Sequence, residues 1–406
     1  MKQGPVRRKA VSERRAKHSG FCEEGRKMGK KVIVAGHICL DITPVFPAGK
    51  SDTLTDILLP GKLIQMEAAD VHTGGAVANT GLAMKLLGAE VSLMGKVGTD
   101  TFGDMVCRIL KKYRAEEGLI RAEGESTSYS VVLALPGTDR IFLHHPGANH
   151  TFCAADVPAD SLKDTTLFHF GYPPLMRSMY DNDGEQLLTL MQKAKEAGAA
   201  TSLDMAAVDE TSDAGKADWD LILRSVLPFV DFFVPSAEEL CFMLDKPRLK
   251  TWKERAAGKD ITEILDWKRD IRPLADRCMA YGTKVLLIKC GAPGMYYRTA
   301  GLEKLEKAGE RVEWDRSEWA DREGFEGSYV PDRILSGTGA GDTSIAAFLT
   351  AVLEGCPPET AMQLAAAAGA SCVEAYDALG GLMPLDKLQE KIRAGWRKRD
   401  DGADDL

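Results

Sequence analysis

The chain lacks most of the features that mark membrane, secreted, metal-binding and nucleic-acid-binding proteins. No apolar run approaches the roughly 20 residues that a membrane-spanning helix needs, and residues 1–28 contain no apolar signal core. None of the nine cysteines forms a Cys-x-x-Cys pair and the seven histidines have no metal-ligand spacing, so neither a zinc site nor a disulfide framework is predicted. Lys and Arg number 52 against 60 Asp and Glu, and the resulting charge of −8 argues against a nucleic-acid-binding surface.

What remains is the composition of a soluble globular protein. Of 406 residues, 44% are hydrophobic and 28% are charged, which is an ordinary balance for a folded chain. We therefore expect a protein of the reducing cytoplasm with mostly buried thiols and without a nucleic-acid or membrane partner.

Strand-like and helical stretches alternate along much of the chain. This alternation predicts an α/β fold with a largely parallel sheet, and such sheets bind ligands at the carboxyl ends of their strands. The expected strands are 31–35, 91–94, 167–170, 200–203, 230–234 and 284–289, and the expected helices include 77–87, 102–113, 185–197 and 271–281.

Several segments break the alternation and suggest how the chain is organised. Residues 42–73 have little helical pattern, and residues 127–144 resemble a hairpin with a turn at 136–139. We expect these two regions, about 42–73 and 125–146, to form a small sheet over the site. The other expected parts are a main domain at 29–395, surface insertions at about 245–270 and 301–328, a disordered extension or misassigned start at 1–28, and an acidic tail at 396–406.

The most informative motif is the glycine-rich stretch Ser336-Gly337-Thr338-Gly339-Ala340-Gly341-Asp342, which opens an amphipathic helix. The free N–H groups and the dipole of a helix start can hold an anion. Asp342 could accept a proton from a hydroxyl that attacks a phosphoryl group, although Asp is also a common helix cap. No Gly-Lys-Ser/Thr ending follows, so a Walker-type loop is not indicated.

Other glycine-plus-polar clusters follow the predicted strands. Asp41 could accept hydrogen bonds from ligand hydroxyls, or it could belong to a turn. Asp100, within Gly95 to Gly103, is expected to cap the helix after it rather than touch a ligand. Glu239 could be a first-turn acid and Lys289 a solvated charge. The clusters are Gly36 to Asp41, Gly74-Gly75-Ala76-Val77-Ala78-Asn79, Gly95 to Gly103, Val234 to Leu240 and Lys289 to Gly294.

In order and spacing these clusters resemble the ribokinase-like (PfkB) carbohydrate kinase family over about residues 30–390. Gly95 to Gly103 resembles its N-terminal signature and Gly337 to Asp342 its C-terminal one. The resemblance implies a three-layer α/β/α sandwich with a mostly parallel central sheet and a small β lid. It also implies ATP-dependent phosphorylation of a hydroxymethyl group on a small molecule.

The resemblance implies a role for each matching position. Asp342 would be the general base, and the turn before it would hold the transferring phosphoryl group. The implied residues are Asp342, Gly339, Ala340 and Gly341 for catalysis; Asp41, Gly74, Gly75, Asn79 and Asn149 for the acceptor; Ser236, Lys289, Gly291, Gly294, Thr338, Gly339 and Gly341 for the nucleotide; and Glu239 for Mg²⁺ through water.

Two positions depart from the family pattern and leave questions open. Ser336 stands where the family commonly has an Asp that helps to bind a monovalent cation, so activation by K⁺ is in doubt. Ser236 stands where the family has an Asn, which could weaken magnesium binding.

The acceptor also stays open. It could be a sugar, a phosphosugar or a nucleoside, and a catalytically idle sugar sensor is a further alternative, although a sensor needs no base. A dinucleotide-dependent oxidoreductase is disfavoured because no Gly-x-Gly-x-x-Gly follows the first strand. The family resemblance leads us to expect a homodimer through the lid.

Overall fold

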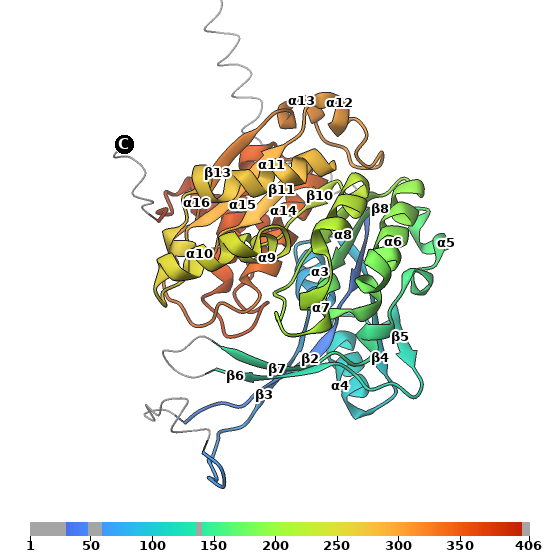
Figure 1. Ribbon diagram of the computed structural model, residues 1–406, viewed down its shortest axis with the longest axis vertical. Helices are drawn as coiled ribbons and strands as arrows, with labels where there is room; N and C mark the ends of the chain where they lie inside the picture. The colour runs from blue at the N-terminus through green and yellow to red at the C-terminus, as the bar shows by residue number, and fades with distance from the viewer. Residues whose placement is uncertain (1–29, 48–58, 135–139, 400–406) are drawn as a thin grey trace, which may run out of the picture. The chain divides into compact units, whose positions relative to one another are not determined.

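A nine-stranded sheet forms the centre of the unit that begins at Lys31 (Figure 1). The structure, a computed structural model, describes residues 30–47, 59–134 and 140–399. Neighbouring strands are parallel except at β11–β12 and β12–β13. The strands, in sheet order, are β13 (Glu323–Gly327), β12 (Gly294–Thr299), β11 (Val285–Lys289), β10 (Phe232–Phe233), β9 (Ala200–Asp204), β8 (Thr165–Gly171), β1 (Lys31–Gly36), β4 (Glu90–Gly98) and β5 (Leu119–Ala122).

The central strands are buried along almost their whole length because helices cover both faces of the sheet. All seven residues of β8 and all five of β9 are buried, as are Val32 to Gly36 of β1. Each strand that the sequence predicts is present. Gly36 of β1 pairs with Gly171 of β8, which pairs with Asp204 of β9, so the carboxyl ends of these strands meet at one edge.

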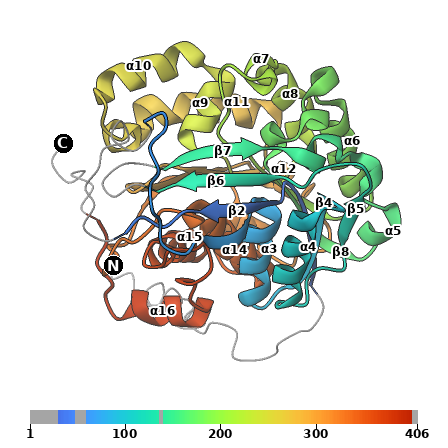
Figure 2. The same cartoon turned by 90° about the horizontal axis from the view of Figure 1, so that it is seen from below.

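Two layers of helices enclose the sheet, which makes the predicted α/β/α sandwich. Figure 2 shows the two layers on opposite sides of the sheet. Helix α14 is buried from Asp342 to Leu353 because it packs against α3 and α15, its neighbours in the same layer. The principal helices are α6 (Glu185–Glu196), α8 (Trp219–Val226), α9 (Ala237–Leu244), α10 (Lys246–Ala256) and α11 (Arg272–Tyr281) in one layer, and α3 (Ala76–Leu86), α4 (Thr101–Lys111), α14 (Ala340–Leu353), α15 (Pro358–Cys372) and α16 (Leu385–Arg393) in the other.

A second, four-stranded sheet matches the predicted lid. Its order is β3 (Asp70–Gly74), β2 (Cys39–Thr43), β6 (Tyr129–Leu133) and β7 (Ile141–His145), and β6 and β7 form the expected antiparallel hairpin. The predicted turn at 136–139 lies outside the described residues, as do part of the 42–73 segment, the extension at 1–28 and the end of the acidic tail.

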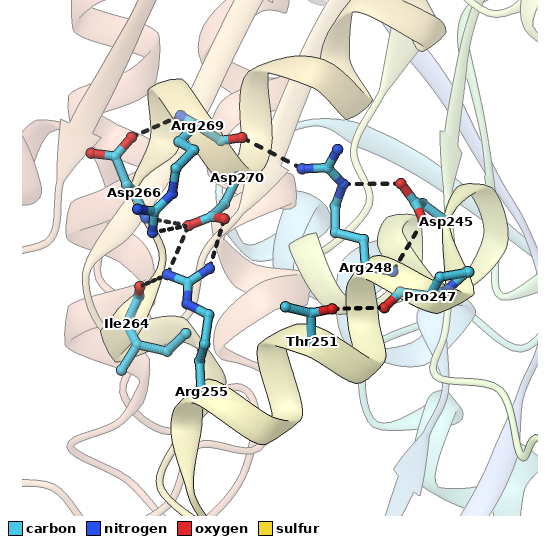
Figure 3. Close-up of polar contacts among 9 residues, drawn as sticks. All are labelled: Asp245, Pro247, Arg248, Thr251, Arg255, Ile264, Asp266, Arg269 and Asp270. Atoms are coloured by element: carbon cyan, nitrogen blue, oxygen red, sulfur yellow. Dashed lines mark hydrogen bonds and ion pairs between the residues drawn. The ribbon is translucent and has the colours of Figure 1, made fainter.

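The two charged segments differ from the surface insertions that the sequence suggested. Leu249 and Trp252 of α10 are buried in the core, so this helix is part of the packed layer. The charges of the segment pair with one another: Arg255 binds the buried Asp270 at 2.8 Å (Figure 3). The 301–328 segment supplies β13, the edge strand of the main sheet, and buries Trp319. In both segments a few buried aromatic residues stand among many charged ones, so the sequence pattern did not show that the segments pack into the fold.

Among the described residues, no helix is long and apolar enough to cross a bilayer.

Candidate active site

The glycine turn before α14 leaves backbone donors open at the start of the helix. Gly339 has φ 74°, and a Cβ there would lie 2.2 Å from the Cβ of Ala378, so only glycine fits. Within the described residues, the N–H groups of Gly341 and Asp342 donate to no partner, whereas Ala340 makes a long 3.4 Å bond to the carbonyl of Gly337. Free N–H groups and the helix dipole together favour an anion at this point.

Asp342 is 5% exposed and receives three side-chain hydrogen bonds. Tyr172 donates its hydroxyl to Oδ1 at 2.7 Å, and Thr80 donates to the same oxygen at 3.2 Å. Asn79 donates its amide to Oδ2 at 3.0 Å. None of these donors is a backbone N–H of α14, so the alternative of Asp342 as a helix cap is wrong.

Lys289, at the end of β11, lies beside the same turn. Its ammonium group donates to Oδ1 of Asp204 at 2.7 Å, and its side chain is 15% exposed. A Cβ on Gly341 would lie 3.8 Å from Nζ of Lys289. The alternative of Lys289 as a solvated charge is therefore wrong: it is a buried cation next to the open end of α14.

Acidic groups outnumber this cation. Burial and the nearby carboxylates of Glu239 and Asp342 raise the pKa of Asp204 to about 8, although Lys289 opposes the shift. Burial lowers the pKa of Lys289, but the carboxylates of Asp204 and Glu239 outweigh it and the net shift is upward. Oδ2 of Asp204 is buried without a partner among the described residues. The cluster therefore keeps one acceptor oxygen without a partner among the described residues.

The Ser236 and Glu239 pair forms the start of α9. Ser236 donates its N–H to Oε2 of Glu239 at 2.7 Å, and its hydroxyl accepts from the N–H of Glu239 at 3.3 Å. This is a capping box, which satisfies two free N–H groups of the helix. Glu239 is therefore an acid of the first turn of α9, as the alternative stated. Its Oε1 atom has no partner among the described residues.

Gly291 and Gly294 shape the turn between β11 and β12. Gly291 has φ 65° and packs on Thr262, and a Cβ at Gly294 would lie 2.2 Å from the carbonyl oxygen of Glu326. Both glycines are thus required for packing, whether or not they also face a nucleotide.

Asp41 lies in β2, against the start of α3. A Cβ at Gly74 would lie 2.1 Å from Oδ2 of Asp41, so glycine is needed for the carboxylate to fit. Burial raises the pKa of Asp41, while hydrogen bonds from Cys39 and Ser130 oppose the shift. Gly75 has φ 85°, and a Cβ there would lie 2.5 Å from Nδ1 of His37, so glycine is needed here too.

His37 lies beside His144 of the small sheet and Tyr172, which contacts Asp342. It is 2% exposed, and neither ring nitrogen has a partner among the described residues. Its ring centroid lies 5.1 Å from that of His144 and 6.1 Å from that of Tyr172. Burial lowers the pKa of His37 well below its ordinary value and that of His144 to about 4, so both rings stay neutral near pH 7.

Three predicted residues serve local structure. Asn149 is fully buried and gives its two amide hydrogens to the carbonyls of Ile38 and Pro146, which leaves no donor for an acceptor molecule. Ser336 donates to the hydroxyl of Thr338 at 2.8 Å and accepts from the N–H of Thr338 at 3.1 Å, so the two close a small turn. Asp100 accepts from the N–H of Gly103 at 2.8 Å, which confirms the predicted cap.

Sequence reasoning missed three residues around Asp342. Asp204 and Tyr172 follow the predicted strands 200–203 and 167–170, so the rule that ligands bind at strand ends could have found both. Thr80 stands next to Asn79 in α3, but only the packing of α3 on α14 shows that both side chains reach Asp342.

Comparisons with known proteins bear on the family and the fold of this chain. The family model described as "pfkB family carbohydrate kinase" matches residues 31–383. An uncharacterized sugar kinase of Archaeoglobus fulgidus is 25% identical over 306 residues, 74% of this chain and 98% of that protein. A 5-dehydro-2-deoxygluconokinase of Clostridium perfringens is 24% identical over 383 residues, 92% of this chain and 96% of that protein. Arabidopsis thaliana ribokinase, solved with ribose and ATP, has a TM-score of 0.63 at 18% identity over 89% of this chain and 98% of the ribokinase, a likeness that shows the fold.

Proposed function

Because the chain belongs to the pfkB family of carbohydrate kinases, we propose that it transfers the γ-phosphoryl group of ATP to a hydroxymethyl group of a sugar. The observation that carries this proposal is the place of Asp342. Its carboxylate is buried in the first turn of α14, beside free N–H groups and a buried lysine. A base and an anion site at one point suit the attack of a hydroxyl on a phosphoryl group.

In the proposed reaction Asp342 takes the proton of the acceptor hydroxyl. The hydroxyl oxygen forms a bond to the γ-phosphorus, and the bond from that phosphorus to the bridging oxygen breaks. ADP leaves with the electron pair. Asn79 holds one oxygen of Asp342 at 3.0 Å and thereby fixes the direction of the carboxylate.

The transferring group carries its charge on oxygens that need fixed donors. We assign this role to the N–H groups of Gly341 and Asp342, with Gly339 and Ala340 shaping the turn. Lys289 adds a positive charge next to Gly341. Thr338, Ser236, Gly291 and Gly294 are retained as residues that flank the nucleotide phosphates.

The acceptor would bind between the small sheet and α3. We assign Asp41 to the acceptor hydroxyls, with Gly74 and Gly75 allowing close approach and Asn79 bordering both acceptor and base. Asn149 instead positions the chain at Ile38, because both its amide hydrogens are used there.

The acid cluster fits a magnesium ion that is bound mainly through water and phosphate oxygens. Mg²⁺ usually takes one or two carboxylates from the protein and keeps several waters. Glu239 has a free oxygen, and Oδ2 of Asp204 is buried without a partner among the described residues. When bound, the ion would neutralise charge on the phosphate oxygens.

Potassium is a weaker expectation. The hydroxyl of Ser336 is engaged with Thr338, and it lacks the charge of the Asp that the family commonly has there. We therefore propose at most a small stimulation by K⁺.

We also propose a homodimer through the small sheet, which sedimentation equilibrium tests.

An ADP-release assay with magnesium and ATP across pentoses, hexoses, sugar acids, phosphosugars and nucleosides tests the proposed function. We expect release that depends on one class of sugar. Release only with nucleosides would favour a nucleoside kinase. No release with any acceptor, although ATP binds, would favour the sensor.

A further inference from the structure

Tyr172 has a backbone conformation that is rare for its type. It follows β8 with φ 68° and ψ 43°, in the left-handed region, and Pro173 comes next. Bulky residues are true outliers in this region, and a following proline further disfavours helical angles. Such outliers persist where the surroundings hold them, and they gather at functional sites.

The surroundings hold Tyr172 from both sides. A Cβ on Gly171, the residue before it, would lie 2.1 Å from the Cβ of Ala76, so β8 fits tightly against the start of α3. The N–H of Tyr172 donates to the carbonyl of Asp204 at 3.3 Å. The backbone therefore directs the side chain toward α14.

The phenol makes the shortest contact to Asp342. Its hydroxyl lies 2.7 Å from Oδ1, against 3.0 Å for Asn79 to Oδ2 and 3.2 Å for Thr80 to Oδ1. Burial, together with the charges of Asp342 and Asp204, raises the pKa of Tyr172 well above its ordinary value. The phenol thus keeps its hydrogen near neutral pH and acts toward Asp342 as a donor.

The three contacts make the two oxygens of Asp342 unequal. A carboxylate oxygen has two lone pairs, and both of those on Oδ1 are engaged by Tyr172 and Thr80. Among the described residues, Oδ2 has only the contact with Asn79 and keeps one lone pair open.

We propose that Tyr172 is a positioning residue for phosphoryl transfer: with Thr80 it anchors Oδ1 of Asp342, so that Oδ2 faces the acceptor hydroxyl and takes its proton. This inference rests on the proposed role of Asp342 as the base.

The test is Tyr172→Phe, which removes one oxygen atom. We expect kcat to fall about tenfold to a hundredfold, because a slightly misdirected base is much less effective. The KM of the acceptor should change less than threefold. The Kd of ATP should also stay within threefold of that of the wild type, so that the loss is confined to kcat.

The matched control is Tyr281→Phe. Tyr281 also donates its phenol to a carboxylate, Oδ1 of Asp220 at 2.5 Å, but it lies between the outer helices α8 and α11. Its kcat should equal that of the wild type. Thr80→Val is the second probe, and it should lower kcat by a smaller factor, with the KM of the acceptor again little changed, since the bond it removes is longer.

A kcat of Tyr172→Phe within threefold of that of the wild type overturns the proposal. A kcat and an acceptor KM that worsen by similar factors do the same, because a general loosening of the site gives that result. If Tyr172→Phe does not fold, an unchanged kcat in Thr80→Val rejects the anchoring of Oδ1. Asp342→Asn separates the two proposals: if it is inactive while Tyr172→Phe is normal, the base stands and the positioning role falls.

Discussion

At the scale of single residues, the pair of Lys289 and Asp204 shows how the site balances its charges. A buried ammonium 2.7 Å from a buried carboxylate is costly to place unless each group has other favourable partners. Here an anion held by the glycine turn would lie next to Lys289. Oδ2 of Asp204, which has no partner among the described residues, could contact a cation. Both observations suit a pair in which Lys289 contacts phosphate and Asp204 contacts a metal ion when the nucleotide binds.

We predict that Lys289→Met lowers kcat about 10²- to 10³-fold, as the loss of one donor to a developing anion does in other enzymes. Initial-rate assays at saturating ATP measure it. Lys195→Met is the matched control, because Lys195 also forms a 2.7 Å pair with a buried carboxylate, that of Asp231, which keeps Lys284 as a second partner. Equal kcat in the two variants would remove Lys289 from the reaction.

Ser336 sets a second prediction at this scale. The hydroxyl of Ser336 is engaged in the turn with Thr338 and carries no charge, so it is a poor ligand for potassium. Potassium should therefore stimulate the rate less than about threefold. A tenfold stimulation would need about 1.4 kcal/mol of additional stabilisation. Rates in potassium and tetramethylammonium salts at equal ionic strength decide it. A stimulation of tenfold or more would show that other ligands form the site without an Asp.

Sequence reasoning at this scale singled out Asp342 and Asn79 because each stands in a glycine-rich cluster that opens a helix, and the structure brings their side chains into contact. It failed where the role depends on packing between distant segments. Asn149 has an amide group that could bind an acceptor, but this group donates to the carbonyl of Ile38. The proposed role of Tyr172 depends on a backbone angle that its own sequence disfavours.

At the scale of elements, the start of α14 depends on Gly339. A side chain there would have to adopt φ 74° and would meet Ala378. We predict that Gly339→Ala lowers the free energy of unfolding by about 2–5 kcal/mol, from left-handed strain of about 1–2 kcal/mol and overpacking of about 1–3 kcal/mol. Urea unfolding measures this change.

Gly395→Ala is the control for the strain alone. Gly395 has φ 89°, but a Cβ there meets nothing within 4 Å. This variant should lose only about 1–2 kcal/mol. Equal losses in the two variants would mean that Ala378 yields to the new methyl group and that the turn is less constrained than its geometry indicates.

Elements with a clear period could be predicted, and elements within charged segments could not. Every strand expected in the main sheet is present, because buried parallel strands are short and apolar. Strand β13, by contrast, contains two glutamates and two glycines and lies at the sheet edge, where burial demands little of its sequence. Helix α10 shows the same limit, since only Leu249, Trp252 and Ala256 of its eleven residues are buried.

At the scale of the whole molecule, buried neutral histidines make stability depend on pH. Burial lowers the pKa of His169 to about 3, that of His144 to about 4 and that of His37 well below its ordinary value. The unfolded chain therefore binds more protons than the folded one below about pH 6.5. These groups withdraw stability as the pH falls from about 6.5 toward 4, and the raised pKa values of Asp204 and Asp41 act in the opposite direction.

Comparison with a variant isolates one group from this balance. Between about pH 6.5 and 5.0, the wild type should lose about 1.5 kcal/mol more free energy of unfolding than His169→Asn does, because the variant has nothing to protonate at that position. Urea unfolding at the two pH values measures the difference. A constant difference would mean that His169 can be charged in the folded protein.

The central claim is that Asp342 takes the proton of the acceptor. The most direct test is the single-turnover rate of phosphoryl transfer in Asp342→Asn, with ATP binding measured in parallel. Asn keeps the shape of the side chain, and its amide oxygen can still accept from Tyr172 and Thr80, although its NH2 group cannot accept from Asn79. It is not a base, so the rate should fall about 10²- to 10⁴-fold while ATP binds nearly as before. A rate within threefold of the wild type would contradict the account.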